Sequence, residues 1–152
     1  MTDLTHLGKQ SIIETSDPSK VVLDAIPNPT SAAIYCCRFT IPEFTSLCPQ
    51  TGQPDFATLI IDYCPNKFLL ESKSLKLFTF AFRNRGDFHE KCTMEVGQRI
   101  YNTIKPHWLR IAGFFNGRGG ISIDIVSEFG FLPQEAHPLS IDNVKLYNNG
   151  HY

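Results

Sequence analysis

The sequence predicts an α+β fold in which two helices cover one face of a four-stranded antiparallel sheet. Three observations predict it: two apolar β-branched segments come first, two segments with helical spacing follow, and two alternating segments come last. Strands joined by hairpins, with helices on one face, are typical of an α+β sandwich. The length of 152 residues fits a single domain, 1–152, with an N-terminal arm at 1–31 and a C-terminal tail at 131–152.

The first two strands are predicted at 33–40 and 56–63, where β-branched and aromatic residues dominate. The segment between them, 41–55, contains three prolines and Gly52, so we expect a long loop. A structureless connection of this length in a compact domain is usually functional or disordered. The arm at 1–31 is polar and punctuated by prolines, which favours a segment wrapped on the surface.

The middle of the chain predicts two helices. The first runs from Glu71 to about Arg83, because apolar residues recur there at helical spacing. The second follows Asn84-Arg85-Gly86, with Asp87 as its N-cap and Glu90 as the partner in a capping box. Its apolar face repeats every fourth residue, and Pro106 marks its end: Cys92, Val96, Ile100 and Ile104.

The last two strands are predicted at 108–115 and 121–125, joined by a turn at 116–120. Four strands leave two open sheet edges, and open edges favour pairing with another chain. We therefore expect the sheet to be extended by self-association.

Composition narrows the possible functions. The chain has 14 basic and 15 acidic residues and a formal net charge of −1, unlike the basic excess of a domain that wraps nucleic acid. No apolar run approaches the roughly 20 residues of a membrane-spanning helix, and the N-terminus lacks a signal-peptide pattern. We expect a cytoplasmic protein without a membrane or stable nucleic-acid partner. Five reduced cysteines without CxxC spacing, and scattered histidines, predict neither disulfides nor a metal site.

Cys48 and Asp55 are the strongest candidates for chemistry. Cys48 lies within the predicted loop, where no periodicity places it in a core, and an accessible thiolate is a nucleophile. Most cysteines are inert and buried, so this alternative stays open. Asp55 lies where the second strand begins; it is a boundary carboxylate or a proton donor near the thiol.

Five other residues allow a structural and a functional interpretation. Lys73 and Lys76 share one helix face, which is either solvated or binds a phosphorylated ligand. His89 and Glu90 either begin the second helix or hold a purine-like ligand. Arg118, at the tip of the last hairpin, is a turn residue that could reach a ligand phosphate.

Together these segments resemble the NADPH-dependent 7-cyano-7-deazaguanine reductases. The run from Glu71 to Phe78, ESKSLKLF, resembles the signature of the family, and each position agrees. EFTSLCPQTGQPDFA resembles its catalytic loop, FRNRGDFHE its substrate segment and GRGGISID its last hairpin. The likeness covers about residues 33–130, and the length is similar to that of the short, single-module subgroup.

The resemblance implies a tunnelling fold, with sheets joined edge to edge into a β-barrel homo-oligomer of stacked rings and sites between subunits. It implies reduction of a nitrile to a primary amine by two NADPH, in tRNA queuosine biosynthesis. Cys48 would form a thioimide intermediate and Asp55 would donate the proton. Further roles follow by position: the substrate would contact Leu70, Glu71, Ser72, His89 and Glu90, and NADPH would contact Lys73, Lys76 and Arg118.

Three alternatives differ in their requirements. A cyclohydrolase of the same fold would need zinc ligands, and no suitable cluster is visible in the sequence. An amidino-forming enzyme that acts on nitrile-modified tRNA would keep Cys48 and Asp55 without the reductase signature. A non-enzymatic purine- or pterin-binding module would need neither residue at this spacing.

Overall fold

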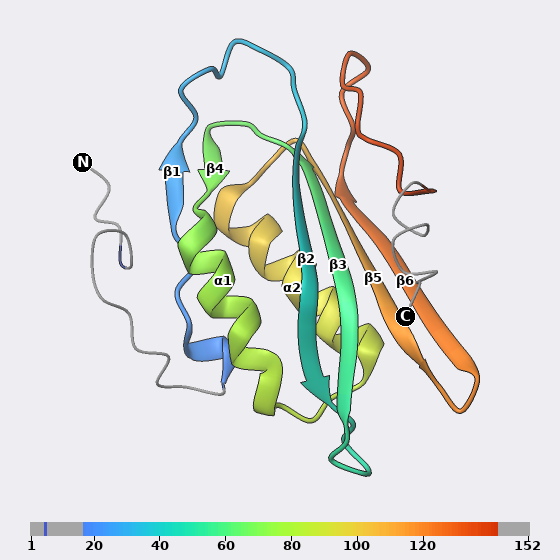
Figure 1. The fold of residues 1–152 in the computed structure, drawn as a ribbon. Helices are drawn as coiled ribbons and strands as arrows, with labels where there is room; N and C mark the ends of the chain where they lie inside the picture. Colours follow the sequence, from blue (N-terminus) through green and yellow to red (C-terminus); the bar gives the residue numbers. More distant parts are fainter. Residues whose placement is uncertain (1–4, 6–16, 143–152) are drawn as a thin grey trace.

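The computed structural model describes Thr5 and residues 17–142, and it confirms an α+β architecture (Figure 1). Two helices lie between the second and third strands of the large sheet and cover one of its faces: α1 (Ser72–Phe80) and α2 (His89–Ile104). The sheet is antiparallel throughout, in the order β2-β3-β5-β6: β2 (Cys37–Leu47), β3 (Pro54–Cys64), β5 (Trp108–Arg118) and β6 (Ile121–Gly130).

A small second sheet was not predicted. Strand β1 (Ala25–Pro27) pairs antiparallel with β4 (Phe68–Leu70), so the element order is longer than two strands, two helices and two strands. Strands of three residues leave too short an alternating pattern to detect in a sequence. Two short 3₁₀ helices, Pro18–Lys20 and Ala81–Asn84, complete the described elements.

The prediction of a long loop at 41–55 was wrong. Strand β2 continues to Leu47 and β3 begins at Pro54, so only residues 48–53 connect them. Pro42 is compatible with β2 for two reasons. The strand lies at the sheet edge, and its register with β3 shifts between Ile41 and Phe44, which marks a bulge. The first strand therefore begins later than predicted and ends later as well.

The last hairpin also differs from its predicted bounds. Strand β5 extends to Arg118, and the turn is made by Gly119 and Gly120, whose φ angles are +60° and +82°. Glycine adopts such angles without steric cost, which explains the pair. The register between β5 and β6 shifts between Phe115 and Arg118, and β6 continues to Gly130, beyond the predicted end.

Helix α1 begins with a side-chain cap. The Glu71 carboxylate accepts hydrogen bonds from the backbone N–H groups of Lys73 (2.8 Å) and Ser74 (2.7 Å). These bonds satisfy two of the donors that a helix start leaves open. The helix ends at Phe80, and the 3₁₀ turn that follows completes the predicted span to about Arg83.

The predicted capping box of the second helix is wrong. Its N-cap is Phe88, without a side-chain hydrogen bond, and Asp87 instead pairs with Arg85 (2.9 Å) and Lys91 (2.8 Å). The Asp87 carboxylate is thus occupied by two cations and does not cap the helix. The predicted apolar face is confirmed, since these side chains are all buried: Cys92, Val96, Ile100 and Ile104.

The main core lies between the helices and the sheet. The N-terminal arm contributes to it, because Val21 and Leu23 are buried in the same cluster as the helix side chains. Arg99 of α2 holds this segment by donating a hydrogen bond to the Val21 carbonyl oxygen at 2.8 Å. The arm therefore contributes to the core at Val21 and Leu23 and is not only a surface segment. Residues 1–4 and 6–16 of the arm and 143–152 of the tail lie outside the described residues.

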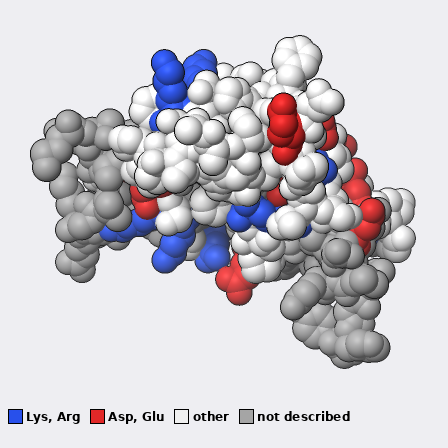
Figure 2. Space-filling model, turned by 90° about the horizontal axis from the view of Figure 1, so that it is seen from above, with Lys and Arg blue, Asp and Glu red and all other residues white. Residues whose placement is uncertain are grey.

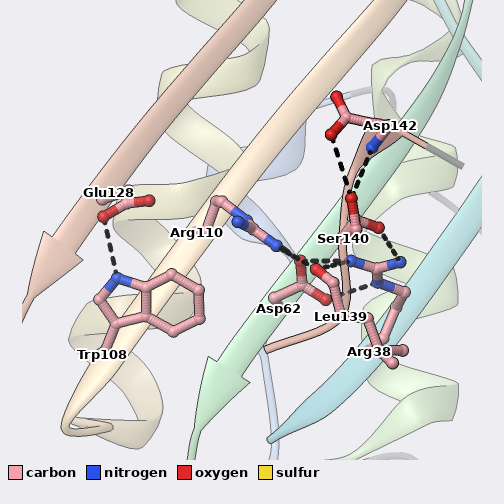
Figure 3. A network of polar contacts seen from close by, with 8 residues as sticks. All are labelled: Arg38, Asp62, Trp108, Arg110, Glu128, Leu139, Ser140 and Asp142. Carbon is pink, nitrogen blue, oxygen red and sulfur yellow. Dashed lines mark hydrogen bonds and ion pairs between the residues drawn. The ribbon is translucent and has the colours of Figure 1, made fainter. Parts of the chain in front are cut away.

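The other face of the sheet carries a polar network (Figure 3). Asp62 of β3 is bracketed by Arg38 of β2 and Arg110 of β5, and both arginines also donate to the Leu139 carbonyl oxygen, at 2.8 and 2.7 Å. The described part of the tail is thereby held against this face, where Ala136 and Ile141 contact small apolar clusters.

Charged groups are dispersed on the end of the molecule seen in Figure 2. Uncharged atoms make up most of this view, and the lysine and arginine groups stand in separate clusters. Within residues 17–142, no helix is long and apolar enough to cross a membrane.

Candidate active site

Five predicted site residues line one small cavity at the end of the sheet where β2 and β3 are connected. The cavity has a volume of about 160 Å³. The β2–β3 turn, the start of β3, the start of α2 and the end of β5 contribute these side chains: Cys48, Asp55, His89, Glu90 and Arg118. Residues far apart in the sequence thus meet at one cavity.

The Cys48 thiol lies in a tight turn and is partly buried. The Cys48 N–H donates to the Gln53 carbonyl oxygen at 2.8 Å, and the Gly52 N–H donates to the Cys48 carbonyl oxygen at 2.9 Å. Gly52 has a φ of +69°, which favours glycine at this position. The backbone around the sulfur is therefore fixed by its own turn, in contrast to the long loop that we predicted.

Hydrogen bonds to the sulfur favour the thiolate. Donation from Arg118, then from the side chain and backbone of Thr51 and the backbone of Gln50, lowers the pKa of Cys48 to about 6, against a smaller opposing effect of burial. At neutral pH most of this thiol is ionised. A thiolate is the nucleophilic form of cysteine, so the arrangement suits attack on an electrophilic carbon.

Asp55 lines the same cavity as the thiol and is 3% exposed. Its Oδ1 is 2.9 Å from Arg118 Nε, and its Oδ2 is 3.0 Å from His89 Nε2. Within the described chain, neither contact has the angles of a good hydrogen bond, although both are at ion-pair distance. A buried carboxyl whose oxygens are not held by well-aligned hydrogen bonds is suited to proton transfer.

His89 is held by its neighbours. Its ring stacks on Phe115, with centroids 4.0 Å apart and an interplanar angle of 11°, and its Nε2 points to Asp55. Glu90 is exposed in the first turn of α2, at the mouth of the cavity. The geometry thus separates two adjacent residues: His89 contacts the acid, and Glu90 is open to a ligand.

Leu70, Glu71 and Ser72 are not part of this cavity. They line a different one, of about 520 Å³, together with Cys37 and Tyr63 at the other end of β2 and β3. Ten residue steps along β2 separate the two ends, about 33 Å at 3.3 Å per step. Within one protomer, the predicted substrate residues therefore form two groups at opposite ends of the sheet. Both carboxylate oxygens of Glu71 are also used by the helix cap.

The predicted cofactor residues are divided in the same way. Lys76 lines a groove of about 380 Å³ between α1 and β2, with Ser72 at its border. Lys73 is on the same helix, whereas Arg118 belongs to the thiol cavity. The ammonium groups of the two lysines fit the phosphates of NADPH by charge, and Arg118 does not lie near them in the same protomer.

Two residues of the site were missed by the sequence analysis. Thr51 donates to the Cys48 sulfur, and Phe115 supports the His89 ring. A threonine three residues after a cysteine in a turn is a weak signal, and the place of Phe115 depends on strand register. No group of three or more metal-binding side chains occurs among residues 17–142.

Comparison with known proteins agrees with the fold. Residues 54–131 match the family model described as QueF-like protein. A crystal structure titled as the archaeosine synthase QueF-Like, in the apo form, has the same fold, with a TM-score of 0.59 and 19% identity. The match covers 64% of this chain and 96% of that one. The chain is thus a QueF-like protein in which a thiol of lowered pKa shares a cavity with a buried carboxyl.

Two curated relatives narrow this class to a family. The NADPH-dependent 7-cyano-7-deazaguanine reductase of Brucella anthropi is 53% identical over 133 residues, 88% of this chain and 85% of the relative. That of Parvibaculum lavamentivorans is 54% identical over 131 residues, 86% and 84% of the two chains. The chain belongs to the family of NADPH-dependent 7-cyano-7-deazaguanine reductases, which confirms the resemblance.

Proposed function

We propose that the protein reduces the nitrile of 7-cyano-7-deazaguanine to the primary amine of 7-aminomethyl-7-deazaguanine, with NADPH, in queuosine biosynthesis. The observation that supports this function best is a thiol with a pKa of about 6 that shares one cavity with the buried carboxyl of Asp55. A nitrile carbon accepts hydride poorly, and a covalent intermediate divides the reaction into easier steps.

The first step is addition of the Cys48 thiolate to the nitrile carbon. A carbon–sulfur bond forms, the electron pair of the broken π bond moves to the nitrile nitrogen, and this nitrogen takes the proton of the Asp55 carboxyl. The product is a neutral thioimidate, and Asp55 becomes a carboxylate. His89 contacts Asp55 at 3.0 Å, so its imidazole can help to return a proton to the acid.

NADPH, when bound, supplies the two hydrides of the four-electron reduction. Between the two reductions the carbon–sulfur bond must break, and Cys48 leaves as a thiolate. A thiol of low pKa leaves faster than an ordinary one. The hydrogen bonds that lower the pKa of Cys48 therefore favour both its attack and its departure.

The complete substrate site is proposed to form between two copies of the chain. One copy supplies Cys48, Asp55, His89 and Glu90, and its neighbour supplies Leu70, Glu71 and Ser72. Two features support this arrangement: the two groups are about 30 Å apart in one protomer, and β2 and β6 each have no further partner strand in the described sheet. Edge-to-edge pairing into a barrel would join the two groups and cover both edges.

The decisive experiment mixes the protein with NADPH and 7-cyano-7-deazaguanine and follows the nicotinamide absorbance. We expect oxidation of two NADPH for each amine formed, with mass spectrometry identifying the amine. Binding of the nitrile without NADPH oxidation would contradict the proposal and would favour a binding module. Reaction only with nitrile-containing tRNA would favour the amidino-forming alternative.

A further inference from the structure

We propose that Arg118 is a positioning residue of the thiol site, whose guanidinium holds the Cys48 sulfur and the Asp55 carboxyl group together, and that it does not bind cofactor phosphate. The catalytic importance of Arg118 rests on the proposed function, whereas its contacts with Cys48 and Asp55 do not depend on that function. A guanidinium presents five N–H donors in a planar fork and can therefore join two acceptors.

The contacts of Arg118 account for this role. Its Nε is 2.9 Å from Asp55 Oδ1, and its guanidinium donates to the Cys48 sulfur. Cys48 and Asp55 come from one hairpin, in which Leu47 is paired with Pro54 and Ser46 with Asp55. Arg118 reaches this hairpin from β5, on the far side of β3, and links two elements that are distant in sequence.

The bulge in β5 determines which way Arg118 points. Phe115 shares the helix-covered face with Ala57, and strict alternation along β5 would place Arg118 on the opposite face. The register with β6 shifts between Phe115 and Arg118, so that Arg118 is paired with Ile121 on the same side as Phe115 and Asp55. Bulges commonly redirect a side chain next to an active site.

Arg118 is the cation among the charged groups that line the thiol cavity. The titratable and charged groups that line this cavity with Cys48 are three carboxyl groups, one imidazole and one guanidinium: Asp55, Asp87, Glu90, His89 and Arg118. Asp87 is already paired with Arg85 and Lys91, and carboxylates disfavour a neighbouring thiolate. Among the described lining residues, Arg118 has the permanent positive charge that opposes them, and its hydrogen bond is the largest cause of the low pKa of Cys48.

The test measures the pKa of Cys48 from the pH dependence of its alkylation by iodoacetamide, followed by peptide mass spectrometry to separate it from the other four cysteines. In Arg118→Gln we expect the pKa to rise from about 6 towards the ordinary value of about 8.5. At pH 7 the ionised fraction would fall by up to roughly thirtyfold, and by less to the extent that the remaining Thr51 and Gln50 donors still lower the pKa. The whole profile is needed, because a thiolate of lower pKa is also less nucleophilic, which reduces the rate difference at any single pH.

Two further variants separate position from charge. Arg118→Lys keeps the charge and should retain part of the low pKa. Lys105→Gln also removes one positive charge, but Lys105 follows the other end of α2, about 24 Å away along that helix, so the pKa of Cys48 should not change. An equal change in Lys105→Gln would show a general charge effect and overturn the proposal.

The affinity for NADPH tests the second part of the proposal, that Arg118 does not bind cofactor phosphate. We expect the dissociation constant of NADPH to differ less than twofold between wild type and Arg118→Gln, in a fluorescence titration without nitrile. Weaker NADPH binding together with an unchanged Cys48 pKa would overturn the proposal and assign Arg118 to the cofactor. Since alkylation needs neither nitrile nor NADPH, this result does not depend on whether the reductase activity itself is found.

Discussion

Asp55 and Asp62 lie on the same strand, and both are almost completely buried, yet their surroundings differ. The Asp62 side chain, on the face away from the helices, accepts hydrogen bonds from Arg38 at 2.6 and 2.9 Å and from Arg110 at 2.7 and 3.2 Å. Asp55, on the helix-covered face, has two ion-pair contacts of poorer geometry and opens onto the thiol cavity.

The difference shows how one residue type serves two purposes in one strand. A buried carboxylate whose oxygens are saturated by arginines fixes these arginines in place. Here the same arginines donate to the carbonyl oxygens of Leu139 and Ser140 and thereby hold the returning segment. A buried carboxyl with unsaturated oxygens is costly to stability unless it has another use. The position of Asp55 beside Cys48 provides that use.

The largest expected effect is the loss of covalent adduct formation when Cys48, which shares the cavity with Asp55, is replaced. Intact mass spectrometry of the protein incubated with the nitrile alone should show one added ligand, and Cys48→Ala should show none. Cys36→Ala is the control, because burial raises the pKa of Cys36 to about 11 and leaves its thiol un-ionised at neutral pH. An adduct that persists in Cys48→Ala would contradict the assignment of the nucleophile.

Replacing each aspartate by asparagine tests the comparison directly. Asp55→Asn should lower kcat by about 10²- to 10⁴-fold, the usual contribution of a general acid, and should change the unfolding free energy little. Asp62→Asn should lower the unfolding free energy by about 3–5 kcal/mol, because two partly buried arginines lose their counter-charge. Urea denaturation of both variants measures the unfolding free energy, and steady-state kinetics measures kcat. If both lose stability equally, the functional distinction between the two carboxyls is wrong.

Glu90→Gln should have a smaller effect, on substrate affinity alone. Loss of one charged hydrogen bond should weaken nitrile binding by about 1.5–3 kcal/mol, roughly ten- to a hundredfold. Because Phe88 and not Asp87 precedes α2 as its cap, and Glu90 is exposed, the melting temperature should hardly change. Unchanged affinity in a calorimetric titration would remove Glu90 from the proposed substrate site.

The smallest effect is expected at the other end of the molecule. Lys73→Ala together with Lys76→Ala should raise the KM for NADPH about three- to tenfold, because each exposed ionic contact contributes at most about 1 kcal/mol. The KM for NADH, which lacks the 2′-phosphate, should change much less. Equal increases for both nucleotides would indicate a structural or solvated role for the two lysines.

Periodicity in the sequence was enough to predict the large elements. The spacing of Cys92, Val96, Ile100 and Ile104 on α2 reflects burial on one face, which the structure confirms. The alternating segment at 108–115 does form strand β5, but both of its faces are buried there. The extent of β2 was missed because Pro42 normally interrupts a strand, and only the edge position and the bulge make it acceptable. The pairing of β1 with β4 depends on contacts between segments that carry no pattern of their own.

The site was predictable in its residue types and less so in its geometry. Cys48 and Asp55 were chosen from their setting and from the resemblance, and they do share a cavity. The place of Arg118 was not predictable, because a bulge that reverses the direction of one side chain leaves no signature beyond a glycine-rich turn. Asp87 was misassigned as a helix cap because competition from Arg85 and Lys91 exists only in three dimensions.

The short connection at 48–53 has a consequence for the order in which the protein gains its reactivity. A hairpin such as β2–β3 closes by local contacts in about 1–10 μs, whereas pairing of β3 with β5 waits for the closure of a much longer loop. Cys48 and Asp55 can therefore meet before Arg118 arrives. Until β5 is in place, the thiol lacks the main cause of its low pKa, and a smaller fraction of it is expected to be ionised. The nascent chain would thus carry a less reactive cysteine, and full thiol reactivity at neutral pH would report that β5 has paired with β3.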